Sequence, residues 1–409
     1  MPEIGYFIPE FPGQTHIFFW RERQILSEFD ITTDIISTRR PPRAIASHAW
    51  ANEAEDLTTY LSPLTKKDLL LSLQEVIKAG PAKWFYCLKL ILNSDGTSLK
   101  QKLQLFALLI ASGKLVRLAR ETGWSHIHVH SCANSANVAM FASIIGNISY
   151  SMTLHGPVLS EYGPNQRQKW KHASFGFAVS QKLYEALKEQ IGRDLPPVEV
   201  IPMGVDLNKI KRRSEYIPWK QGEICNIFAC GRLNLIKGHN YLLQAVKMLR
   251  ERGINAHLKI AGEDEQGGTG YHQYLDQLIR ELNLSDCVQL LGAVSEEKVR
   301  EGLENAHVFA LASLNEGIPV AVMEAMAMAM PVVVTDVGGN AELIDDGVDG
   351  ILIQPENPVQ LADTIEKVVC NEALARSLSQ KSREKIVAKF SSTRSAKILA
   401  DYLDKTHVS

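Results

Sequence analysis

The 409-residue sequence has almost no net charge, no paired cysteines and no long apolar run. Its 44 Lys and Arg residues balance 46 Asp and Glu residues, so no global field favours nucleic acid, and we expect no nucleic-acid partner. The six cysteines form no Cys-x-x-Cys pair, so neither a zinc knuckle nor a disulfide framework is indicated. A Gly-x-Gly-x-x-Gly motif after a strand is also missing, which disfavours a nicotinamide oxidoreductase.

Signals for export and for membrane spanning are missing as well. No segment reaches about 18 consecutive apolar residues, and the opening stretch MPEIGYFIPEFPG has no basic region followed by a long apolar one. We therefore expect a cytoplasmic protein. A peripheral position at the inner face of the plasma membrane stays open because of a basic segment described below.

What the sequence does contain is an alternation of short apolar runs with longer amphipathic ones. This alternation is typical of parallel strands joined by crossover helices, and it predicts an α/β protein. The expected strands in the first half are residues 4–8, 32–37, 126–130, 148–154 and 175–180. Those in the second half are residues 225–231, 256–262, 287–292, 307–313, 331–336 and 350–354.

The best domain boundary lies where this rhythm is interrupted. Pro202, Gly204, a basic patch and Pro218 break the periodicity between the two halves. We expect one Rossmann-like domain over 1–203, a second over 204–390, and a helix over 391–409 that packs back on the first. Two doubly wound domains would face each other across a cleft, with ligands beyond the carboxyl ends of their strands.

An insert near 58–120 departs from the rest, being long, helical in pattern and basic. Residues 61–120 contain 10 Lys and Arg against 3 Asp and Glu. One interpretation is a set of solvated lysines on helices that pack on the domain. The other is a basic, apolar surface that docks on an anionic membrane or receives a lipid-linked acceptor.

Two loops of the second half carry the residues most suited to chemistry. Arg232 and Lys237 lie between Gly231 and the helix that starts near His239, a combination that suits a phosphate or diphosphate. In the stretch LNEGIPVAVMEAMAMAM, Glu316 precedes a helix and Glu324 lies about two turns along it.

These two acids admit two interpretations. One acid can bind sugar hydroxyls and the other a vicinal diol such as a ribose, while the amides of residues 317–320 hold an anion. Alternatively, Glu316 caps the helix and Glu324 lies on a polar stripe. The core-like neighbours of Glu324 favour the functional interpretation, because an acid among them needs a partner.

Three histidines, His126, His128 and His130, alternate along one expected strand. Rings on one strand face span too great a distance to share one ion comfortably, so we expect no metal and no cofactor. His130, at the strand end, is a candidate to touch an acceptor.

Taken together, the motifs of the second half resemble those of the retaining glycosyltransferases of family 4, the glycosyl transferases group 1. Glu316 and Glu324 match the E-x7-E element, GRLNLIKG matches the G-R-[LF]-x3-KG loop, and MGVD and VGGNAELIDDGVDGILI occur in order. The resemblance implies the GT-B fold, with an acceptor-binding domain over 1–203 and a nucleotide-sugar donor-binding domain over 204–390. It assigns Arg232 and Lys237 to the donor diphosphate, Glu316 to the sugar hydroxyls, Glu324 to the ribose, and Gly231, Gly317, Ile318 and Val320 to the donor.

The opening stretch PEFPGQTHIFFWRERQIL resembles the P-x-x-SETF-x-x-x-E-x-x-x-L pattern of the bacterial exopolysaccharide branch, which contains colanic acid and amylovoran transferases. GQTHIFFWRE stands where that branch has its Ser-Glu-Thr core. The resemblance places Gly13 at the donor, and Thr15, His16 and Glu22 on the acceptor side. LHGPV resembles the strand-end motif whose His, here His155, lies close to the donor sugar.

The implied function is retaining transfer from a UDP- or GDP-sugar to a lipid-linked or growing glycan, in cell-surface polysaccharide or glycolipid synthesis. Glu316, His155, Arg232 and Lys237 form the expected catalytic set, with front-face attack and no bound metal. Two alternatives stay open. One is a nucleotide-sugar epimerase or hydrolase of the same fold, and the other is a catalytically silent nucleotide-sugar binding protein.

Overall fold

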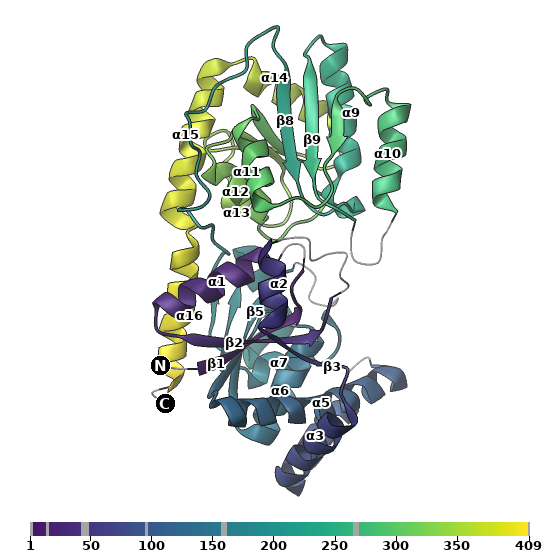
Figure 1. The fold of residues 1–409 in the computed structure, drawn as a ribbon, viewed down its shortest axis with the longest axis vertical. Helices are drawn as coiled ribbons and strands as arrows, with labels where there is room; N and C mark the ends of the chain where they lie inside the picture. Colours follow the sequence, from purple (N-terminus) through teal and green to yellow (C-terminus); the bar gives the residue numbers. More distant parts are fainter. Residues whose placement is uncertain are drawn as a thin grey trace. The chain divides into compact units, whose positions relative to one another are not determined.

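The computed structural model describes residues 3–13, 16–41, 49–94, 97–156, 162–264 and 270–407. The chain divides into two compact units. The first comprises Met1–Pro41, Trp50–Pro202 and Ser395–Ser409, and the second comprises Pro42–Ala49 and Met203–Arg394. Each unit is built around its own parallel sheet (Figure 1).

The first unit, in the part of the chain that is described, has a seven-stranded sheet of order β3-β2-β1-β4-β5-β6-β7, and all its neighbouring strands pair in parallel. Apolar residues of β1 and β6 are buried, together with the inner faces of α1 and α16. The strands are β1 (Glu3–Glu10), β2 (Thr32–Arg39), β3 (Thr58–Ser62), β4 (His126–Val129), β5 (Ser149–Leu154), β6 (Phe175–Ala178) and β7 (Val198–Val200).

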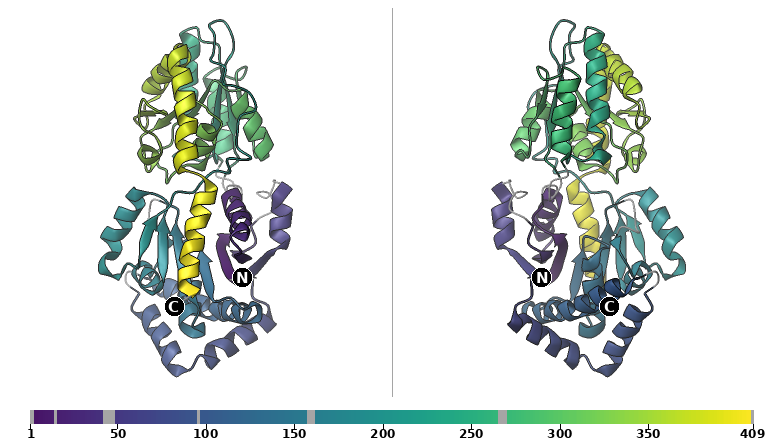
Figure 2. Two further views of the ribbon diagram at one scale, coloured as in Figure 1. Left: turned by 90° about the vertical axis from the view of Figure 1, so that its left-hand side faces the viewer. Right: turned by 90° about the vertical axis from the view of Figure 1, so that its right-hand side faces the viewer.

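The helices of the first unit cover this sheet and extend beyond it. Ala396, Leu399 and Leu403 of α16 pack into the core of this unit, and Figure 2 shows α16 lying along its strands. The helices are α1 (Ile17–Glu28), α2 (Ala49–Asp56), α3 (Lys66–Lys78), α4 (Pro81–Leu92), α5 (Leu99–Thr122), α6 (Asn134–Gly146), α7 (Gln166–His172), α8 (Gln181–Ile191) and α16 (Ser392–His407).

The second unit has a six-stranded parallel sheet among its described residues, of order β10-β9-β8-β11-β12-β13. Its strands are β8 (Cys225–Cys230), β9 (Ala256–Ala261), β10 (Val288–Leu290), β11 (Val308–Leu311), β12 (Val332–Thr335) and β13 (Ile351–Ile353). Its helices are η4 (Leu235–Lys237), α9 (His239–Glu251), α10 (Tyr271–Glu281), α11 (Glu296–Glu304), α12 (Val320–Ala327), α13 (Asn340–Leu343), α14 (Pro358–Val369) and α15 (Glu372–Lys389).

Local sequence explains where the longest helix of the insert begins and ends. Ser98 and Gln101 form a capping box at the start of α5, in which each side chain accepts from the other residue's backbone N–H. Gly123, with a φ of 90°, ends the helix in the left-handed region that glycine adopts without strain. These caps set the two ends of the 24-residue helix.

Two expectations about secondary structure were wrong. Residues 58–62, assigned to the helical insert, form the edge strand β3, because Thr58, Thr59 and Tyr60 are good strand formers and pair with β2. The run VAVMEAMAMAM, residues 320–330, has a helical pattern throughout, but the helix ends at Ala327. Ala329 has a φ of 53°, and Pro331 leads directly into β12.

Both sheets have the doubly wound strand order. In each, the early strands are added on one side of the first strand, and the later strands are added on its other side. The order reverses between β1 and β4 in the first unit and between β8 and β11 in the second. In such sheets ligands bind beyond the carboxyl ends of the strands at this reversal. The loops that follow these four strands are therefore the places to look for function.

Candidate functional site

The loops after β8 and β11 are held against each other at the carboxyl edge of the second sheet. The backbone N–H of Leu314 donates to the carbonyl of Ile236 at 2.7 Å and ties the two loops together. Gly238 ends the first loop with a φ of 61°, and a Cβ at this position would lie 1.9 Å from the carbonyl oxygen of Ala312. Only glycine allows the loops this close an approach.

An ion pair joins the two loops. Lys237 Nζ lies 2.5 Å from Glu316 Oε1, and these side chains are only 16% and 8% exposed. Ser313 Oγ donates to the same carboxylate oxygen at 2.7 Å. Glu316 thus has one cationic and one neutral donor in a site largely shielded from water, where charge-assisted hydrogen bonds are strong.

A second layer of polar contacts supports Glu316 from behind. Thr335, at the end of β12, donates its hydroxyl to the carbonyl of Ser313 at 2.6 Å, and the Asn340 side chain donates to the carbonyl of Thr335 at 2.8 Å. Gly338 lies so close that a Cβ there would be 1.7 Å from the carbonyl oxygen of Glu316. The Gly-rich segment therefore fixes the position of the acid.

Arg232 and Glu324 lie at the margins of this pair. Arg232 is exposed just after β8, and Glu324 is partly buried on α12. Burial raises the pKa of the Cys230 thiol to about 12, with the charge of Glu324 raising it further and Lys237 lowering it. The side chains of Glu324 and Lys237 are therefore close to Cys230, at the end of β8.

Except for Gly13, which follows β1 in the first unit, the remaining predicted donor residues lie on these two loops or at the start of α12. Gly231 directly follows β8. Gly317 and Ile318 precede α12, which begins at Val320, and the carbonyl of Gly317 accepts from the N–H of Gly339 at 2.7 Å. Two cations, two acids and a helix N-terminus next to one another can bind an anion together with hydroxyl groups.

His239, the first residue of α9, was not anticipated as a site residue. Its ring is buried directly behind the Lys237 loop. Burial lowers the pKa of His239 to about 4, and the charge of Lys237 lowers it as well. The imidazole is therefore neutral at physiological pH, and it adds no second charge next to the ion pair.

In the first unit a second cluster lies where its sheet reverses. Tyr6 donates its hydroxyl to Glu22 Oε2 at 2.5 Å, and His130 Nε2 lies 3.2 Å from the same oxygen. His130 Nδ1 lies 3.3 Å from His155 Nε2. Three residues predicted from separate segments, Glu22, His130 and His155, are thus in direct contact.

The environment of this cluster keeps its two histidines neutral. Burial lowers the pKa of both His130 and His155 to about 3. Burial also raises the pKa of Glu22, although the Tyr6 hydroxyl and the neighbouring histidines lower it. Neutral imidazoles can each accept and donate one hydrogen bond, which suits them to a sugar hydroxyl.

Aromatic rings and the loop after β1 surround this cluster. His16, the residue before α1, stacks on Phe11, and its ring centroid lies 5.3 Å from that of Phe19. A Cβ on Gly13 would lie 2.7 Å from His16 Nδ1. A larger residue at position 13 would therefore displace the ring of His16. Thr15, also predicted on the acceptor side, lies outside the described residues.

The other two histidines of β4 form hydrogen bonds within the sheet. His126 contacts Ser149 and Ser151 at 2.7 Å each, and His128 contacts Ser151 at 2.7 Å and Thr153 at 3.0 Å. We call this alternating row of rings and hydroxyls the histidine ladder. Among the residues that the structure describes, no group of three or more His, Cys, Asp or Glu is arranged to hold a metal ion.

A buried lysine near the end of β4 was also missed. Lys169 on α7 is fully buried and donates to the carbonyls of Cys132 and Tyr162. Burial lowers its pKa to about 7. The residue holds the loop that follows β4, and no sequence motif marks it, because its partners are backbone atoms.

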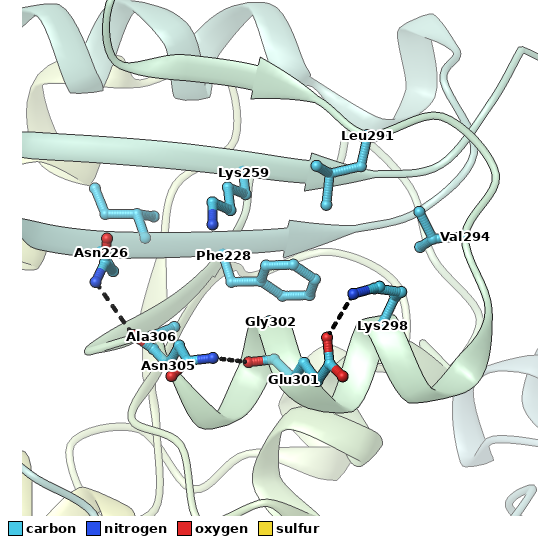
Figure 3. A pocket seen from close by; sticks show the side chains of 11 residues that line it. Asn226, Phe228, Lys259, Leu291, Val294, Lys298, Glu301, Gly302, Asn305 and Ala306 are labelled. Atoms are coloured by element: carbon cyan, nitrogen blue, oxygen red, sulfur yellow. Dashed lines mark hydrogen bonds and ion pairs between the residues drawn. The ribbon is translucent and has the colours of Figure 1, made fainter.

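A separate pocket lies on the second sheet, between its strands and α11. Figure 3 shows Phe228, Lys259 and Leu291 on one side of it and Lys298 on the other, paired with Glu301 at 2.9 Å. None of the residues selected from the sequence lines this pocket. It is therefore distinct from the loops that carry Lys237 and Glu316.

The fold defines the class of protein. Two parallel sheets of Rossmann order are those of the GT-B fold. Over 100% of both chains the structure is similar to a sucrose-phosphate synthase from Thermosynechococcus elongatus, with a TM-score of 0.73 and 18% identity. It is similarly close to Anabaena HepE in complex with UDP, with a TM-score of 0.72 and 18% identity over 99% and 100% of the two chains. The predicted fold is thereby confirmed.

The family follows from the sequence. Residues 220–385 match the family model "Glycosyl transferases group 1". The chain is 30% identical over 243 residues to "Putative colanic acid biosynthesis glycosyltransferase WcaL" of Salmonella typhimurium, a match that covers 54% of this chain and 57% of that protein. The chain spans about half the length of the curated relatives it matches. Residues 220–385 thus match this family, and the resemblance that the motifs of the second half indicated is confirmed there.

Proposed function

We propose that the protein is a retaining glycosyltransferase that moves a sugar from a nucleotide-sugar donor to an acceptor hydroxyl. The observation that carries the proposal is the shielded Lys237–Glu316 pair at the reversal of the second sheet. It lies within the region that matches the glycosyl transferases group 1. The proposal is supported because this site combines a cation that suits phosphate with an acid that suits hydroxyl groups. The site also lies where sheets of this kind bind ligands.

On the donor side, each residue has a role that its position supports. Lys237 and Arg232 receive the diphosphate, with the N-terminus of α12 as a further positive end. Glu316 accepts hydrogen bonds from the transferred sugar's hydroxyls, and Glu324 accepts from the ribose. Donor phosphate competes with Glu316 for Lys237, so binding the donor would loosen the ion pair and leave the acid free for the sugar.

On the acceptor side, we assign the hydroxyl nucleophile to the cluster of the first unit. His130 and His155, both neutral, can orient a hydroxyl without adding charge, and Glu22 orients His130. His16 and Thr15 complete the proposed acceptor set. His155, at the strand end, is also the residue that we place closest to the donor sugar.

The reaction needs no covalent intermediate. The bond from the anomeric carbon to the phosphate oxygen breaks, and the acceptor oxygen bonds to the same face of the sugar. The acceptor proton passes to the departing phosphate oxygen, and the configuration is retained. Lys237 and Arg232 stabilise charge that develops on the leaving diphosphate, which is stabilisation specific to the transition state. Glu316 is bonded by Lys237 and Ser313 and is not placed as a nucleophile.

We infer a UDP- or GDP-sugar as donor, and a lipid-linked or growing glycan of a cell-surface polysaccharide or glycolipid as acceptor. The printed name of the Salmonella relative refers to colanic acid biosynthesis, and a solved structure of Anabaena HepE contains UDP-glucose. UDP-glucose is therefore the first donor to test. We place the reaction in the cytoplasm, where nucleotide sugars would be the available donors.

A donor panel tests the proposal directly. The purified protein is incubated with UDP-, GDP- and ADP-sugars, with and without EDTA, and release of the nucleoside diphosphate is followed. We expect one donor to release its nucleoside diphosphate, and we expect EDTA not to reduce that release. Lys237→Met should reduce release at least about a hundredfold, the scale of losing one donor to a developing anion. Lys220→Met, an exposed lysine of the same unit, is the matched control and should leave release unchanged.

The same experiment separates the alternative functions. An epimerase would yield an isomer or a free sugar and a hydrolase a free sugar, whereas a transferase yields a glycoside once an acceptor is supplied. A silent binding protein would be protected against heat by a nucleotide sugar without releasing any diphosphate. Equal turnover by Lys237→Met and the unmodified protein would remove Lys237 from the site.

A further inference from the structure

The helical insert of the first unit exposes apolar side chains in two regular stripes. Phe85 and Leu92 of α4 are 66% and 64% exposed, and Leu99, Leu103 and Phe106 of α5 are 76%, 64% and 45% exposed. Globular proteins rarely expose a contiguous group of this kind unless it contacts something. The stripes lie on neighbouring helices, because Lys102 of α5 donates to the carbonyl of Leu92 at 2.8 Å.

The spacing shows that these are faces of helices and not scattered residues. Phe85, Lys89 and Leu92 are separated by four and three positions, and Leu99, Leu103 and Phe106 by the same steps. The opposite face of each helix is packed, with Cys87 and Ile91 buried on α4 and Leu105 and Leu109 buried on α5. We call the six stripe residues the docking face. Both helices are thus apolar on their inner and outer sides.

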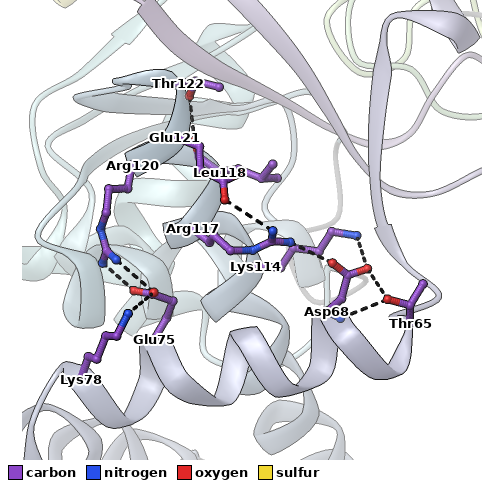
Figure 4. A network of polar contacts seen from close by, with 10 residues as sticks. All are labelled: Thr65, Asp68, Glu75, Lys78, Lys114, Arg117, Leu118, Arg120, Glu121 and Thr122. Carbon is purple, nitrogen blue, oxygen red and sulfur yellow. Dashed lines mark hydrogen bonds and ion pairs between the residues drawn. The ribbon is translucent and has the colours of Figure 1, made fainter.

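Charge decides which partner fits the docking face. Between Pro81 and Arg120 the sequence has a single acidic residue, Asp95. On the other side of the insert, the acids of α3 are already occupied. Figure 4 shows Asp68 bonded to Lys114 and Arg117, and Glu75 bonded to Arg120 and Lys78.

These ion pairs neutralise the cations around α3 and leave the positive character at α4 and the start of α5. Lys89 lies within the first stripe, and Lys100 is exposed next to the second. Apolar side chains with interspersed lysines and no acids match the interface of an anionic lipid bilayer, where lysine stems cover apolar surface and their ammonium groups reach the headgroups. A second copy would instead bring lysines of like charge together.

We propose that the docking face of α4 and α5 binds the surface of an anionic membrane. The two helices would lie in the interface, since α4 has only 12 residues and a spanning helix needs about 20. The longer α5 has 24 residues, but lysines, arginines and glutamines interrupt its apolar positions. In agreement, no helix among the described residues is long and apolar enough to cross a membrane. The inference goes beyond the proposed function, because lipid binding requires neither donor nor acceptor. It gives a lipid-linked acceptor a route to the first unit.

Flotation with lipid vesicles tests the proposal on the full chain. We expect the protein to float with a two-to-one mixture of phosphatidylcholine and phosphatidylglycerol, and far less with phosphatidylcholine alone. Added salt should weaken the binding. The double variant Lys89→Glu and Lys100→Glu should weaken it at least about tenfold, because each basic residue near an anionic surface contributes roughly a fivefold factor.

A second variant tests the apolar part. Leu92→Ser with Leu99→Ser should reduce binding to the anionic vesicles while the salt dependence remains. The matched controls lie in the second unit, Lys220→Glu for charge and Ile217→Ser, 66% exposed, for apolarity. Neither control should change flotation. All six side chains substituted in these variants are exposed, so each variant is expected to keep the thermal unfolding midpoint of the unmodified protein.

Two results would overturn the proposal. One is flotation that ignores lipid charge, salt and both docking-face variants. The other is a dimer in solution that these variants dissociate, with no vesicle binding, which would assign the face to a second copy of the chain. Release of nucleoside diphosphate from a soluble donor is measured in parallel. If the unmodified protein released no nucleoside diphosphate from any donor, that result would count against the proposed function and not against lipid binding.

Discussion

Acidification should destabilise the first unit through His130, and the size of the effect can be worked out from its burial. The ring is 1% exposed and lies between Glu22 and His155. Burial lowers its pKa to about 3, whereas histidine in an unfolded chain titrates near 6.5. Between these values the unfolded state binds a proton that the folded state does not, so stability falls as the pH falls below about 6.5.

The loss is about 1.4 kcal/mol for each pH unit in this window, or about 2 kcal/mol between pH 6.5 and about pH 5. Burial raises the pKa of Glu22, which contributes with the opposite sign. The measurement is therefore a difference. The free energy of unfolding of the unmodified protein should fall by about 2 kcal/mol more over this range than that of His130→Gln.

Urea unfolding followed by tryptophan fluorescence is a suitable assay. Trp20, Trp50, Trp84, Trp124 and Trp170 belong to the first unit and only Trp219 to the second. The signal therefore reports mainly on the unit that contains His130. Parallel pH profiles for the two proteins would refute the reasoning, because they would mean that His130 is as easily protonated in the folded state as in the unfolded one.

Three further predictions concern other buried groups. Lys237→Met should lower the free energy of unfolding by about 3 to 5 kcal/mol, because it leaves the Glu316 carboxylate buried without its cation. Adding Glu316→Gln to that variant should restore most of the lost stability. Denaturant unfolding of the two single variants and the double variant measures this, and additive losses would mean that the pair does not interact. Gly238→Ala should destabilise by more than the roughly 1 to 2 kcal/mol of a left-handed residue, since its Cβ would also clash with the Ala312 carbonyl; an unchanged melting temperature would contradict this. Lys169 has a pKa lowered to about 7, so the unfolded state keeps its proton to higher pH, and the unmodified protein should gain about 1.4 kcal/mol per pH unit above 7; Lys169→Met should lack this gain, and a shared slope in urea unfolding would speak against it.

The second unit could be predicted more fully than the first. All six strands described in this unit fall within the short runs that the sequence marked as strands, and the residues on its two loops follow strand ends directly. Their meeting was predictable, because neighbouring parallel strands end at one edge. Sequence could not show that Ser313 and Lys237 would both bond Glu316, since the lysine is 79 positions away.

The first unit shows where local pattern is insufficient. β3 follows the short helix α2 and precedes three more helices, so five residues of strand were hidden in a helical stretch. Tyr6 donates to Glu22 from among the buried apolar residues of β1, and Lys169 donates to backbone carbonyls. Such partners depend on tertiary packing, which periodicity does not encode.

The histidine ladder has a direction that one backbone group determines. The hydroxyl of Ser149 donates to the carbonyl of Ser125 at 3.1 Å, and a carbonyl can only accept. The single proton of Ser149 is thereby used. His126 must then donate to Ser149 through Nδ1, which leaves its Nε2 without a proton.

The same constraint passes along the strand from ring to ring. Ser151 gives its proton to His126, so His128 must carry its own proton on Nδ1 and accept at Nε2 from Thr153. Every hydroxyl proton in the row therefore points back toward the start of β4. At the far end of the row, next to the cluster of His130 and His155, the hydroxyl of Thr153 on β5 has already donated its proton and can only accept. Its role is therefore set by the carbonyl of Ser125, which lies at the opposite end of the same strands.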